Sequence, residues 1–294
     1  MKILLFGRDG QLGTDLTKTL VSENLSDNVE LSAYGIKDLD LTHFDRLHDV
    51  IKHERPDLII NAAAYTAVDK AESDAELAAM VNSAAPEVMA KAATEINAGM
   101  IHYSTDYVFN GTARHPYTEE SLTSPESVYG LTKLNGEKAV LDHCENSLIL
   151  RTSWVYSMHG QNFLSTMLRL AAERDELTIV DDQVGAPTST TALSDATLKL
   201  VQYFMLNGEF SAAVRGVYHM TCAGEASWYD FAKAIIAASE FSDTRVVPIT
   251  TAEYPTAAKR PAYSVLSNNK LFNTFGIRLP AWENALAQCM QENK

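Results

Sequence analysis

Tyr129 and Lys133 have the residue types and the spacing that proton transfer requires. A tyrosine phenol has an unperturbed pKa of about 10, so it exchanges protons poorly near neutral pH unless a nearby cation favours the phenolate. A lysine four residues later on a helix lies on the tyrosine's own face and can be that cation. The candidate proton-transfer site is therefore the segment Tyr129-Gly130-Leu131-Thr132-Lys133.

A threonine hydroxyl is expected beside this pair. The apolar run at residues 99–104 predicts a strand, which ends immediately before Thr105. Thr105 should then project at the carboxyl edge of a sheet. A hydroxyl in that position can hydrogen-bond both a substrate oxygen and the phenol of Tyr129.

Gly7, Gly10 and Gly13 directly follow the first predicted strand and open a helix. Glycine lets the backbone turn sharply and approach a pyrophosphate, and the helix N-terminus offers unpaired N–H groups and a positive dipole end. A glycine triplet can also be an ordinary strand-to-helix turn, but its place in a strand–turn–helix unit favours dinucleotide binding. Together with Tyr129 and Lys133, it predicts a carbonyl reductase that uses a nicotinamide dinucleotide.

The end of the second predicted strand bears on which dinucleotide is used. An NAD-preferring site commonly has an acidic residue there, which holds the ribose 2′-hydroxyl. This chain has Ser32-Ala33-Tyr34-Gly35 at that place, with Lys37 just beyond. We therefore expect NADPH to be accepted, because no carboxylate would repel a 2′-phosphate, and NADH stays open as a second cofactor.

Two further segments are candidates for cofactor contact. The segment Asp38-Leu39-Asp40-Leu41 follows the second strand and can reach the adenine, although a solvated loop and helix lead-in explains it equally well. The third strand ends in Asn61-Ala62-Ala63-Ala64-Tyr65-Thr66, whose small side chains would let a cofactor lie against the backbone. Packing beneath a helix also explains the alanines, but not the tyrosine and threonine.

Apolar runs rich in Ile, Leu and Val alternate with helix-period segments in the first half, which predicts a parallel sheet covered on both faces. The fold class is therefore α/β, a doubly wound parallel (Rossmann) sheet with a smaller C-terminal α/β cap. We expect a dinucleotide-binding domain at residues 1–155 and mainly a substrate-binding cap at 156–294, with some segments returning to the sheet. The predicted strands cover residues 2–6, 29–33, 57–61, 99–104, 148–152 and 178–180, and the predicted helices 11–22, 44–53, 74–96, 128–142, 162–174, 193–205 and 228–239.

Charge and composition exclude several classes of function. The formal charge of -14 argues against sequence-independent nucleic-acid binding, which depends on Lys and Arg neutralising phosphates. No apolar run reaches the roughly 18 residues of a membrane span, so no membrane contact and a cytoplasmic location are expected. Cys144, Cys222 and Cys289 are far apart and the histidines form no ligand pattern, so no metal site is predicted.

With these motifs, the chain resembles the extended short-chain dehydrogenase/reductase family, in which Tyr-x-x-x-Lys and an upstream Ser or Thr form the proton-transfer site. Longer motifs make it similar to the dTDP-4-dehydrorhamnose reductases within that family, over nearly the whole chain. These motifs are Asn61 to Glu72, Ser104 to Gly111, Leu150 to Tyr156, Asp182 to Thr188 and Arg260-Pro261.

The resemblance implies reduction of the 4-keto group of dTDP-4-dehydro-β-L-rhamnose to dTDP-L-rhamnose by NADPH or NADH. It implies that Tyr129 supplies the proton, that Lys133 holds the cofactor ribose and lowers the phenol's pKa, and that Thr105 orients Tyr129. The nucleotide-sugar substrate would contact Thr105, Asp106, Tyr107, Trp154 and Arg260. The cofactor would contact Gly7, Gly10, Gln11, Leu12, Gly13, Tyr34, Asp40, Leu41, Ala63, Ala64, Tyr65, Thr66, Tyr103, Tyr129 and Lys133.

One departure concerns a metal. Some relatives dimerise through magnesium held by glutamates, one in the first helix and one after the Gly-Ala-Pro-Thr turn. Here those places hold Asp15 and Ser189-Thr190-Thr191, so a magnesium-bridged dimer is not favoured. A monomer or a weak homodimer is expected.

Of three alternatives, one is disfavoured and two stay open. A nucleotide-sugar 4,6-dehydratase shares the fold, but that family typically has Asp-Glu after the threonine, where this chain has Asp106-Tyr107, so net reduction is favoured over dehydration. A reductase of another nucleotide-4-keto-6-deoxysugar would differ only in cap residues. A non-catalytic NADP-binding regulatory subunit, like the partner protein of methionine adenosyltransferase, can retain the Tyr and Lys.

Overall fold

The apolar runs of the first half become parallel strands. In the computed structural model, which describes residues 1–21 and 29–291, the strands of the central sheet have the order β10-β5-β4-β3-β1-β2, and every neighbouring pair is parallel. The doubly wound α/β fold is thus confirmed, and the five strands predicted for this sheet have ends within one residue of those observed. The strands are β1 (Lys2–Phe6), β2 (Glu30–Tyr34), β3 (Leu58–Asn61), β4 (Gly99–Thr105), β5 (Ser147–Thr152) and β10 (Gly216–His219).

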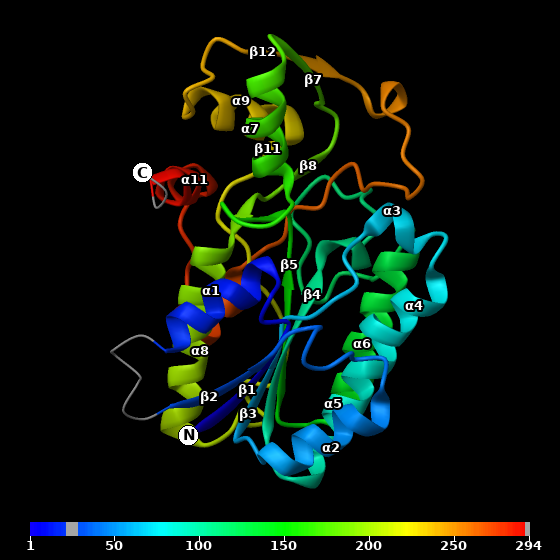
Figure 1. The fold of residues 1–294 in the computed structure, drawn as a ribbon, viewed down its shortest axis with the longest axis vertical. Helices are drawn as coiled ribbons and strands as arrows, with labels where there is room; N and C mark the ends of the chain where they lie inside the picture. Colours follow the sequence, from blue (N-terminus) through cyan, green and yellow to red (C-terminus); the bar gives the residue numbers. More distant parts are fainter. Residues whose placement is uncertain (22–28, 292–294) are drawn as a thin grey trace.

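Helices cover both faces of this sheet (Figure 1). Because side chains alternate along a strand, Ile3 and Leu5 of β1 enter one core while Leu4 and Phe6 enter the other. The first core is closed by α1 (Gln11–Leu20) and α8 (Thr190–Asn207), and the second by α2 (Phe44–Glu54), α5 (Ala85–Glu95) and α6 (Val128–His143). The helix predicted at residues 11–22 is observed as α1, which ends at Leu20; position 22 lies outside the described residues.

The segment predicted as one helix at 74–96 contains a π-helical turn. α3 (Val68–Ala71) precedes it, and α4 (Ala75–Ala79) passes through the π segment Met80–Ala84 into α5. Pro86 has no N–H to bond the carbonyl of Asn82 four residues earlier, which accounts for the wider turn. That carbonyl instead lies against α6, where a Cβ on Gly136 would come within 2.1 Å of it.

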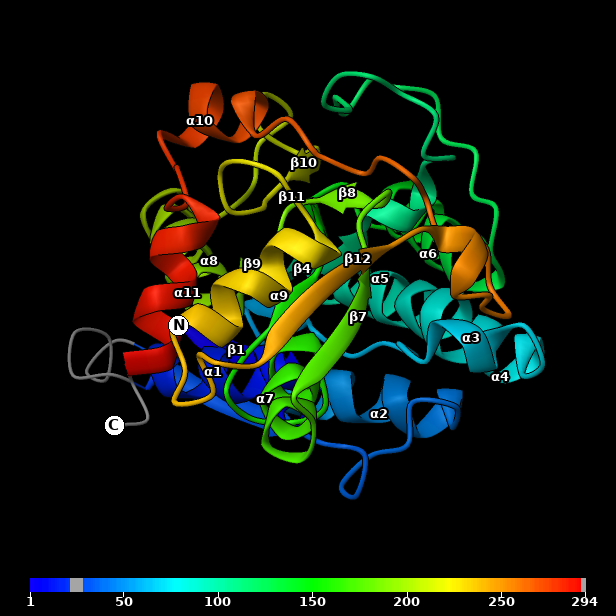
Figure 2. The same ribbon diagram turned by 90° about the horizontal axis from the view of Figure 1, so that it is seen from above.

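The cap lies beyond the carboxyl ends of the central strands (Figures 1 and 2). It is built around α7 (Phe163–Glu173), α9 (Trp228–Ala237) and a parallel pair of strands, β7 (Glu176–Val180) and β12 (Arg245–Ile249). Four two-residue strands form smaller pairs: β6 (Val155–Tyr156) with β9 (Thr188–Ser189), and β8 (Val184–Gly185) with β11 (Ala226–Ser227). The remaining helices are α10 (Asn269–Phe275), α11 (Trp282–Gln291) and the 3₁₀ turns Asp106–Val108 and Thr251–Glu253.

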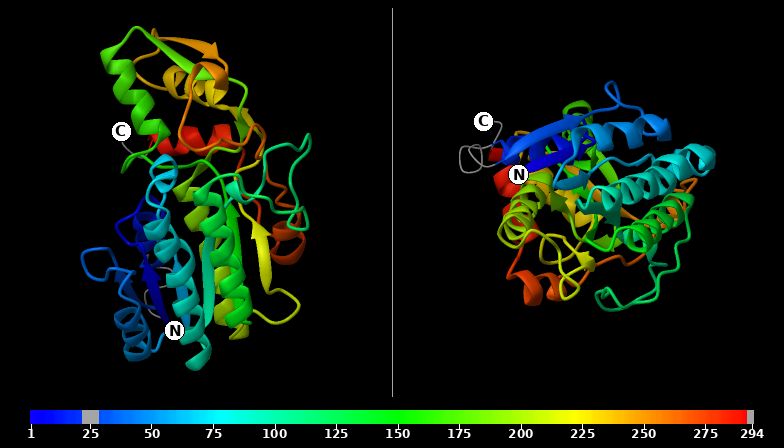
Figure 3. Two further views of the ribbon diagram at one scale, coloured as in Figure 1. Left: turned by 90° about the vertical axis from the view of Figure 1, so that its right-hand side faces the viewer. Right: turned by 90° about the horizontal axis from the view of Figure 1, so that it is seen from below.

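Two elements from the second half of the chain belong to the sheet layers. β10 pairs with β5 at the sheet edge, where Figure 3 shows it in yellow, and α8 packs against α1. Among residues 1–21 and 29–291, no helix combines the length and the hydropathy that a membrane crossing needs.

Candidate active site

The sheet and one helix bring Thr105, Tyr129 and Lys133 together. Thr105 ends β4, while Tyr129 and Lys133 lie in the first two turns of α6. The hydroxyl of Ser127 caps that helix by accepting a hydrogen bond from the Gly130 N–H at 3.1 Å, which fixes where the helix begins. Thr105 and Lys133 are buried, and Tyr129 is half-buried.

The ammonium of Lys133 is held from the sheet side. It donates to the carbonyl oxygen of Tyr103 at 2.6 Å and lies 3.4 Å from Nε2 of His102. Burial lowers the pKa of Lys133 to about 8, and the Glu137 carboxylate opposes this shift. Lys133 is therefore charged at neutral pH, and it begins to lose its proton when the pH rises slightly above neutrality.

His102 is a buried neighbour of Lys133 that the sequence motifs did not single out. The Asn61 amide is oriented because its Oδ1 accepts the Ala63 N–H at 3.1 Å, which places its Nδ2 3.0 Å from Nδ1 of His102. His102 thus contacts the Asn61 amide through Nδ1 and Lys133 through Nε2. Burial and the Lys133 charge both hold the pKa of His102 well below its usual range.

Tyr129 keeps its proton. Burial raises the pKa of the phenol above its usual range, whereas a hydrogen bond with Thr105 lowers it and the charge of Asp106 raises it further. The ring meets Tyr107 edge to face, with ring centroids 5.5 Å apart. A phenol that stays protonated at neutral pH is suited to giving a proton to a developing alkoxide.

Asp106 faces this group from the turn after β4. Its Oδ1 accepts from the Thr105 hydroxyl at 3.1 Å, and burial raises its pKa to about 6, opposed by hydrogen bonds with Ser264 and Thr105. The Thr105 hydroxyl also accepts the Tyr107 N–H at 3.2 Å. These contacts fix the threonine side chain at the edge of the sheet.

A buried ion pair fixes α6 on the sheet. Arg151 of β5 makes two bonds to Glu137 of α6, from Nε at 2.9 Å and Nη2 at 2.6 Å. Ser104 of β4 donates to the same carboxylate at 2.5 Å. Glu137 lies one turn beyond Lys133, so this pair fixes the helix that carries Tyr129.

The glycine-rich turn forms the expected cradle. Gly7 has φ +88°, and a Cβ on it would lie 2.6 Å from the backbone nitrogen of Ala63; a Cβ on Gly13 would lie 1.9 Å from the Gly7 carbonyl oxygen. Only glycine fits at these two positions. The open backbone and the N-terminus of α1 fit a pyrophosphate.

The exit of β3 lies directly against this cradle. Tyr65 is clamped by Asn82, whose Oδ1 accepts the Tyr65 N–H at 2.8 Å and whose Nδ2 donates to the Tyr65 carbonyl at 3.1 Å. The backbone of Ala63 packs against Gly7. The segment that follows it at the exit of β3, Ala64-Tyr65-Thr66, therefore continues from the glycine turn. Asn82 was not among the predicted site residues, because it lies far away in the sequence.

Two tyrosines predicted to contact the cofactor, Tyr34 and Tyr103, use their hydroxyl groups in contacts within the protein. The Tyr34 hydroxyl donates to Glu54 at 2.7 Å, and that of Tyr103 bonds Thr197 on α8 within the core. For Tyr103 the backbone carbonyl, and not the ring, faces Lys133. Asp40 accepts from the N–H and hydroxyl of Thr42, which lower its pKa, and Leu41 packs on the core beneath α2 and α5.

The cap residues take two positions. Trp154, with φ +47°, stacks on Trp228 at 3.5 Å, and a Cβ on Gly185 would come within 2.5 Å of its ring. Arg260 pairs with Asp69 at 2.6 Å, and its guanidinium carbon lies 6.0 Å from the centroid of the Tyr107 ring. The structure thus brings Arg260 beside Tyr107, while Trp154 belongs to an aromatic stack.

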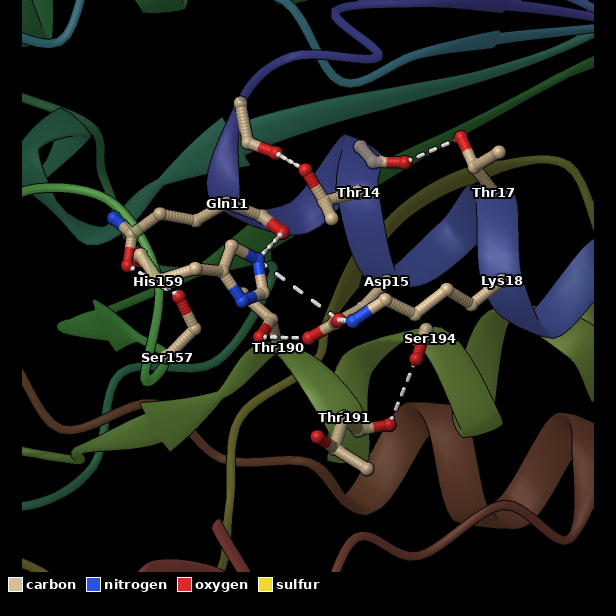
Figure 4. Close-up of polar contacts among 12 residues, drawn as sticks. Gln11, Thr14, Asp15, Thr17, Lys18, Ser157, His159, Thr190, Thr191 and Ser194 are labelled. Atoms are coloured by element: carbon tan, nitrogen blue, oxygen red, sulfur yellow. Dashed lines mark hydrogen bonds and ion pairs between the residues drawn. The ribbon is translucent and has the colours of Figure 1, made fainter. Parts of the chain in front are cut away.

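The place of the possible bridging metal is filled by protein contacts (Figure 4). The Asp15 carboxylate accepts from the Thr190 hydroxyl and pairs with Lys18 at 3.3 Å, and His159 Nε2 lies 3.9 Å away. Within residues 1–21 and 29–291 no three His, Cys, Asp or Glu side chains gather as metal ligands. A lysine and a hydroxyl directed at the carboxylate do not fit a cation site.

A doubly wound sheet, a glycine cradle at its first turn and a Thr–Tyr–Lys group at the carboxyl end of β4 define a dinucleotide-dependent oxidoreductase of the short-chain dehydrogenase/reductase class. Residues 1–294 match the family described as RmlD substrate binding domain. The dTDP-4-dehydrorhamnose reductase of Burkholderia thailandensis is 44% identical over 99% of both chains, and that of Escherichia coli 40% identical over 99% of this chain and 98% of its own. The chain therefore belongs to the dTDP-4-dehydrorhamnose reductase family.

Solved structures agree with this placement. A dTDP-4-dehydrorhamnose reductase from Clostridium acetobutylicum superposes with a TM-score of 0.92 at 40% identity, covering 100% of this chain and 99% of its own. The enzyme from Bacillus anthracis, solved in complex with NADP, gives 0.89 at 34% identity over 99% of both chains.

Proposed function

We propose that the protein reduces the 4-keto group of dTDP-4-dehydro-β-L-rhamnose to give dTDP-L-rhamnose, with NADPH or NADH as reductant. The observation that carries this proposal is that Thr105, Tyr129 and Lys133 lie at the carboxyl end of β4, in the same parallel sheet whose first strand leads into the glycine turn of Gly7 and Gly13. The relatives' names and the NADP complex of the Bacillus anthracis enzyme support the substrate and the cofactor.

A bound reduced nicotinamide supplies hydride to C4 of the sugar. The carbonyl π electrons then move to oxygen, and Tyr129 gives its phenolic proton to the resulting alkoxide, so that a C–H and an O–H bond form. The Thr105 hydroxyl orients the phenol. Lys133 holds the cofactor ribose with donors that its bond to the Tyr103 carbonyl leaves available, and its charge stabilises the phenolate left behind.

The cap would bind the nucleotide diphosphate and the sugar. Arg260 has a planar fork suited to phosphate oxygens and lies beside Tyr107, which would contact the sugar with Asp106 and Trp154. Residues 1–155 would bind the dinucleotide, and most of residues 156–294 would bind the substrate. A monomer or weak homodimer is sufficient for this chemistry.

A coupled assay tests the proposal by generating the 4-keto sugar enzymatically and following NADPH absorbance. We expect wild-type turnover, and a fall of kcat by about 10²–10⁴-fold in Tyr129→Phe, the usual contribution of a positioned general acid. The dissociation constant of NADPH should change little. NMR of the product identifies the configuration at C4 and separates the rhamno sugar from its C4 epimer.

Tyr203→Phe is the matched control, because Tyr203 lies on α8 and its ring packs against Phe210 and Phe275. It should leave turnover unchanged. If the wild-type protein bound NADPH but consumed none with the 4-keto sugar, the non-catalytic alternative would replace this proposal. Turnover that survived Tyr129→Phe would exclude Tyr129 as the proton donor.

A further inference from the structure

The glycine-rich turn is tied to the carboxyl end of β2. The N–H groups of Gly7 and Arg8 both donate to the Tyr34 carbonyl, at 3.0 and 3.2 Å. In dinucleotide-binding sheets this strand end lies beside the adenosine ribose, whose 2′ substituent distinguishes NADP from NAD. Side chains that meet here are therefore placed to read that substituent.

Arg8 extends across this position. Its Nη1 donates to the Ala33 carbonyl at 2.9 Å, its Nη2 pairs with Asp38 at 2.7 Å, and its Nε donates to Asp9 at 3.3 Å. Each nitrogen of the guanidinium thus has a partner within the protein. These contacts leave the guanidinium one N–H on each Nη, and the side of the fork formed by Nε and Nη2 becomes available to a 2′-phosphate only when the carboxylates leave it.

Two carboxylates stand where the sequence predicted none. Asp38 accepts the Gly35 N–H at 2.8 Å, and the Asp9 carboxylate lies over Gly35, where a Cβ would come within 1.8 Å of it. The expectation assigned Asp38 to the adenine and did not include Asp9, but the turn and the following loop bring both acids to this place. The cluster of Arg8, Asp9 and Asp38 therefore has a net negative charge.

The contact between Arg8 and Asp38 is exposed to solvent, with 41% and 38% of the two side chains accessible. Ion pairs at such sites are weak and exchange partners readily, because water solvates both charges. A phosphate dianion offers the fork two parallel hydrogen bonds and a higher charge than one carboxylate.

We propose that Asp38 sets the choice between NADPH and NADH by holding Arg8. When Arg8 pairs with Asp38, its guanidinium is held away from the 2′ substituent, which disfavours the 2′-phosphate of NADPH but costs NADH nothing. When Arg8 releases Asp38, it presents a guanidinium to the 2′-phosphate of NADPH. The inference rests on the proposed use of a nicotinamide dinucleotide, but not on the identity of the sugar.

The test is a double-mutant cycle read by dinucleotide binding. Dissociation constants of NADPH and NADH are measured from nicotinamide fluorescence, so the result does not depend on turnover. Asp38→Asn keeps an oxygen for the Gly35 N–H, yet frees Arg8; it should raise the preference for NADPH about tenfold, the scale of one charge-assisted hydrogen bond. Arg8→Gln should lower that preference by about as much.

In the double variant, Asp38→Asn should add nothing to the effect of Arg8→Gln, because Asp38 acts through the arginine. Lys37→Gln is the matched control, since Lys37 is an exposed cation of the same loop, and it should change the preference much less than Arg8→Gln does. An unchanged preference in Asp38→Asn would overturn the proposal. So would an Asp38→Asn effect that persists without Arg8, or a Lys37→Gln effect as large as that of Arg8→Gln. A protein that binds both dinucleotides as expected but reduces no sugar would refute only the proposed function.

Discussion

Lys133 shows how a single residue can owe its chemistry to its surroundings. Its ammonium is buried between the Tyr103 carbonyl and the ring of His102, and burial lowers its pKa to about 8. A lowered pKa means that the folded protein loses this proton at a lower pH than the unfolded chain does. The positive charge beside Tyr129 is thus present below about pH 8 and lost as the pH rises through that value.

The consequence is an alkaline limb in the pH profile. The value of kcat/KM for the dinucleotide, which reports groups of the free enzyme, should fall above about pH 8 as Lys133 becomes neutral. Lys133→Arg keeps a charge at every accessible pH, so it should reduce activity but remove this limb. Steady-state kinetics between pH 6.5 and about 10 on both proteins provide the measurement. A wild-type profile that stays flat across that range would contradict the assigned pKa.

Arg260 separates two roles that one side chain can play. It is paired with Asp69 at 2.6 Å, and it lies over the Tyr107 ring, near the proposed sugar site. Arg260→Glu should raise KM for the nucleotide sugar about tenfold or more, because it replaces a cation that donates hydrogen bonds to the diphosphate with an anion that repels it. Binding of NADPH, measured by fluorescence, should be unaffected.

Asp69→Asn controls for the ion pair. It removes the charge partner of Arg260 but leaves the guanidinium in place. If Arg260 serves only that pair, the two variants will have equal and small effects on KM. A large rise confined to Arg260→Glu places the arginine on the substrate.

At the scale of elements, periodicity predicted the strands well because both faces of this sheet are covered. β1, β3 and β5 contain the apolar runs 3–6, 58–60 and 148–150, and buried parallel strands require such runs. β10 has four residues at the sheet edge and includes a glycine and a histidine, so it carried no such signal. β12 contains Pro248, which argues against a strand in the interior of a sheet but is accepted in a two-stranded pair.

The site residues, like the strands, fall into those that the sequence predicted and those that it did not. Thr105, Tyr129 and Lys133 lie in one stretch of chain with a recognisable spacing, so the sequence predicted them together. His102, Asn82 and the carboxylates around Arg8 came into view only in three dimensions. Their roles depend on contacts between elements, and no local pattern encodes which side chains will meet there.

The α6 helix should depend on its ion pair with β5. Glu137 and Arg151 are 2% and 5% exposed, so removing one partner leaves a buried charge without compensation. We expect Glu137→Gln to lower the free energy of unfolding by about 3–5 kcal/mol. Lys138→Gln, an exposed neighbour on the same helix, should change it by less than about 0.5 kcal/mol. Urea unfolding followed by circular dichroism measures both, and equal stability of the two variants would show that the pair does not hold the helix.

At the scale of the whole molecule, one glutamine joins the cap to the cofactor domain. Oε1 of Gln11, in the glycine-rich turn, accepts from Ser157 at 3.0 Å and from Asn162 at 2.7 Å (Figure 4 shows Gln11 and Ser157). Its carbonyl lies 3.0 Å from Nε2 of His159. Because the cofactor cradle and the first cap loop share this residue, the position of one depends on that of the other.

The same corner of the molecule bears on assembly. Asp15 lies at the first-helix place to which the family resemblance assigns a magnesium-binding glutamate, but here its carboxylate is already occupied by Lys18 and Thr190. Two donors directed at one carboxylate oppose a divalent cation, since they would have to be displaced and would then repel it. We therefore expect a chelator to change neither the mass in sedimentation velocity nor the rate of NADPH oxidation, and added magnesium to restore nothing. Runs at two protein concentrations separate a weak dimer, whose mass follows concentration, from a metal-bridged one, whose mass follows magnesium. A dimer that dissociates on chelation would mean that Asp15 gives up both of these partners to bind the metal.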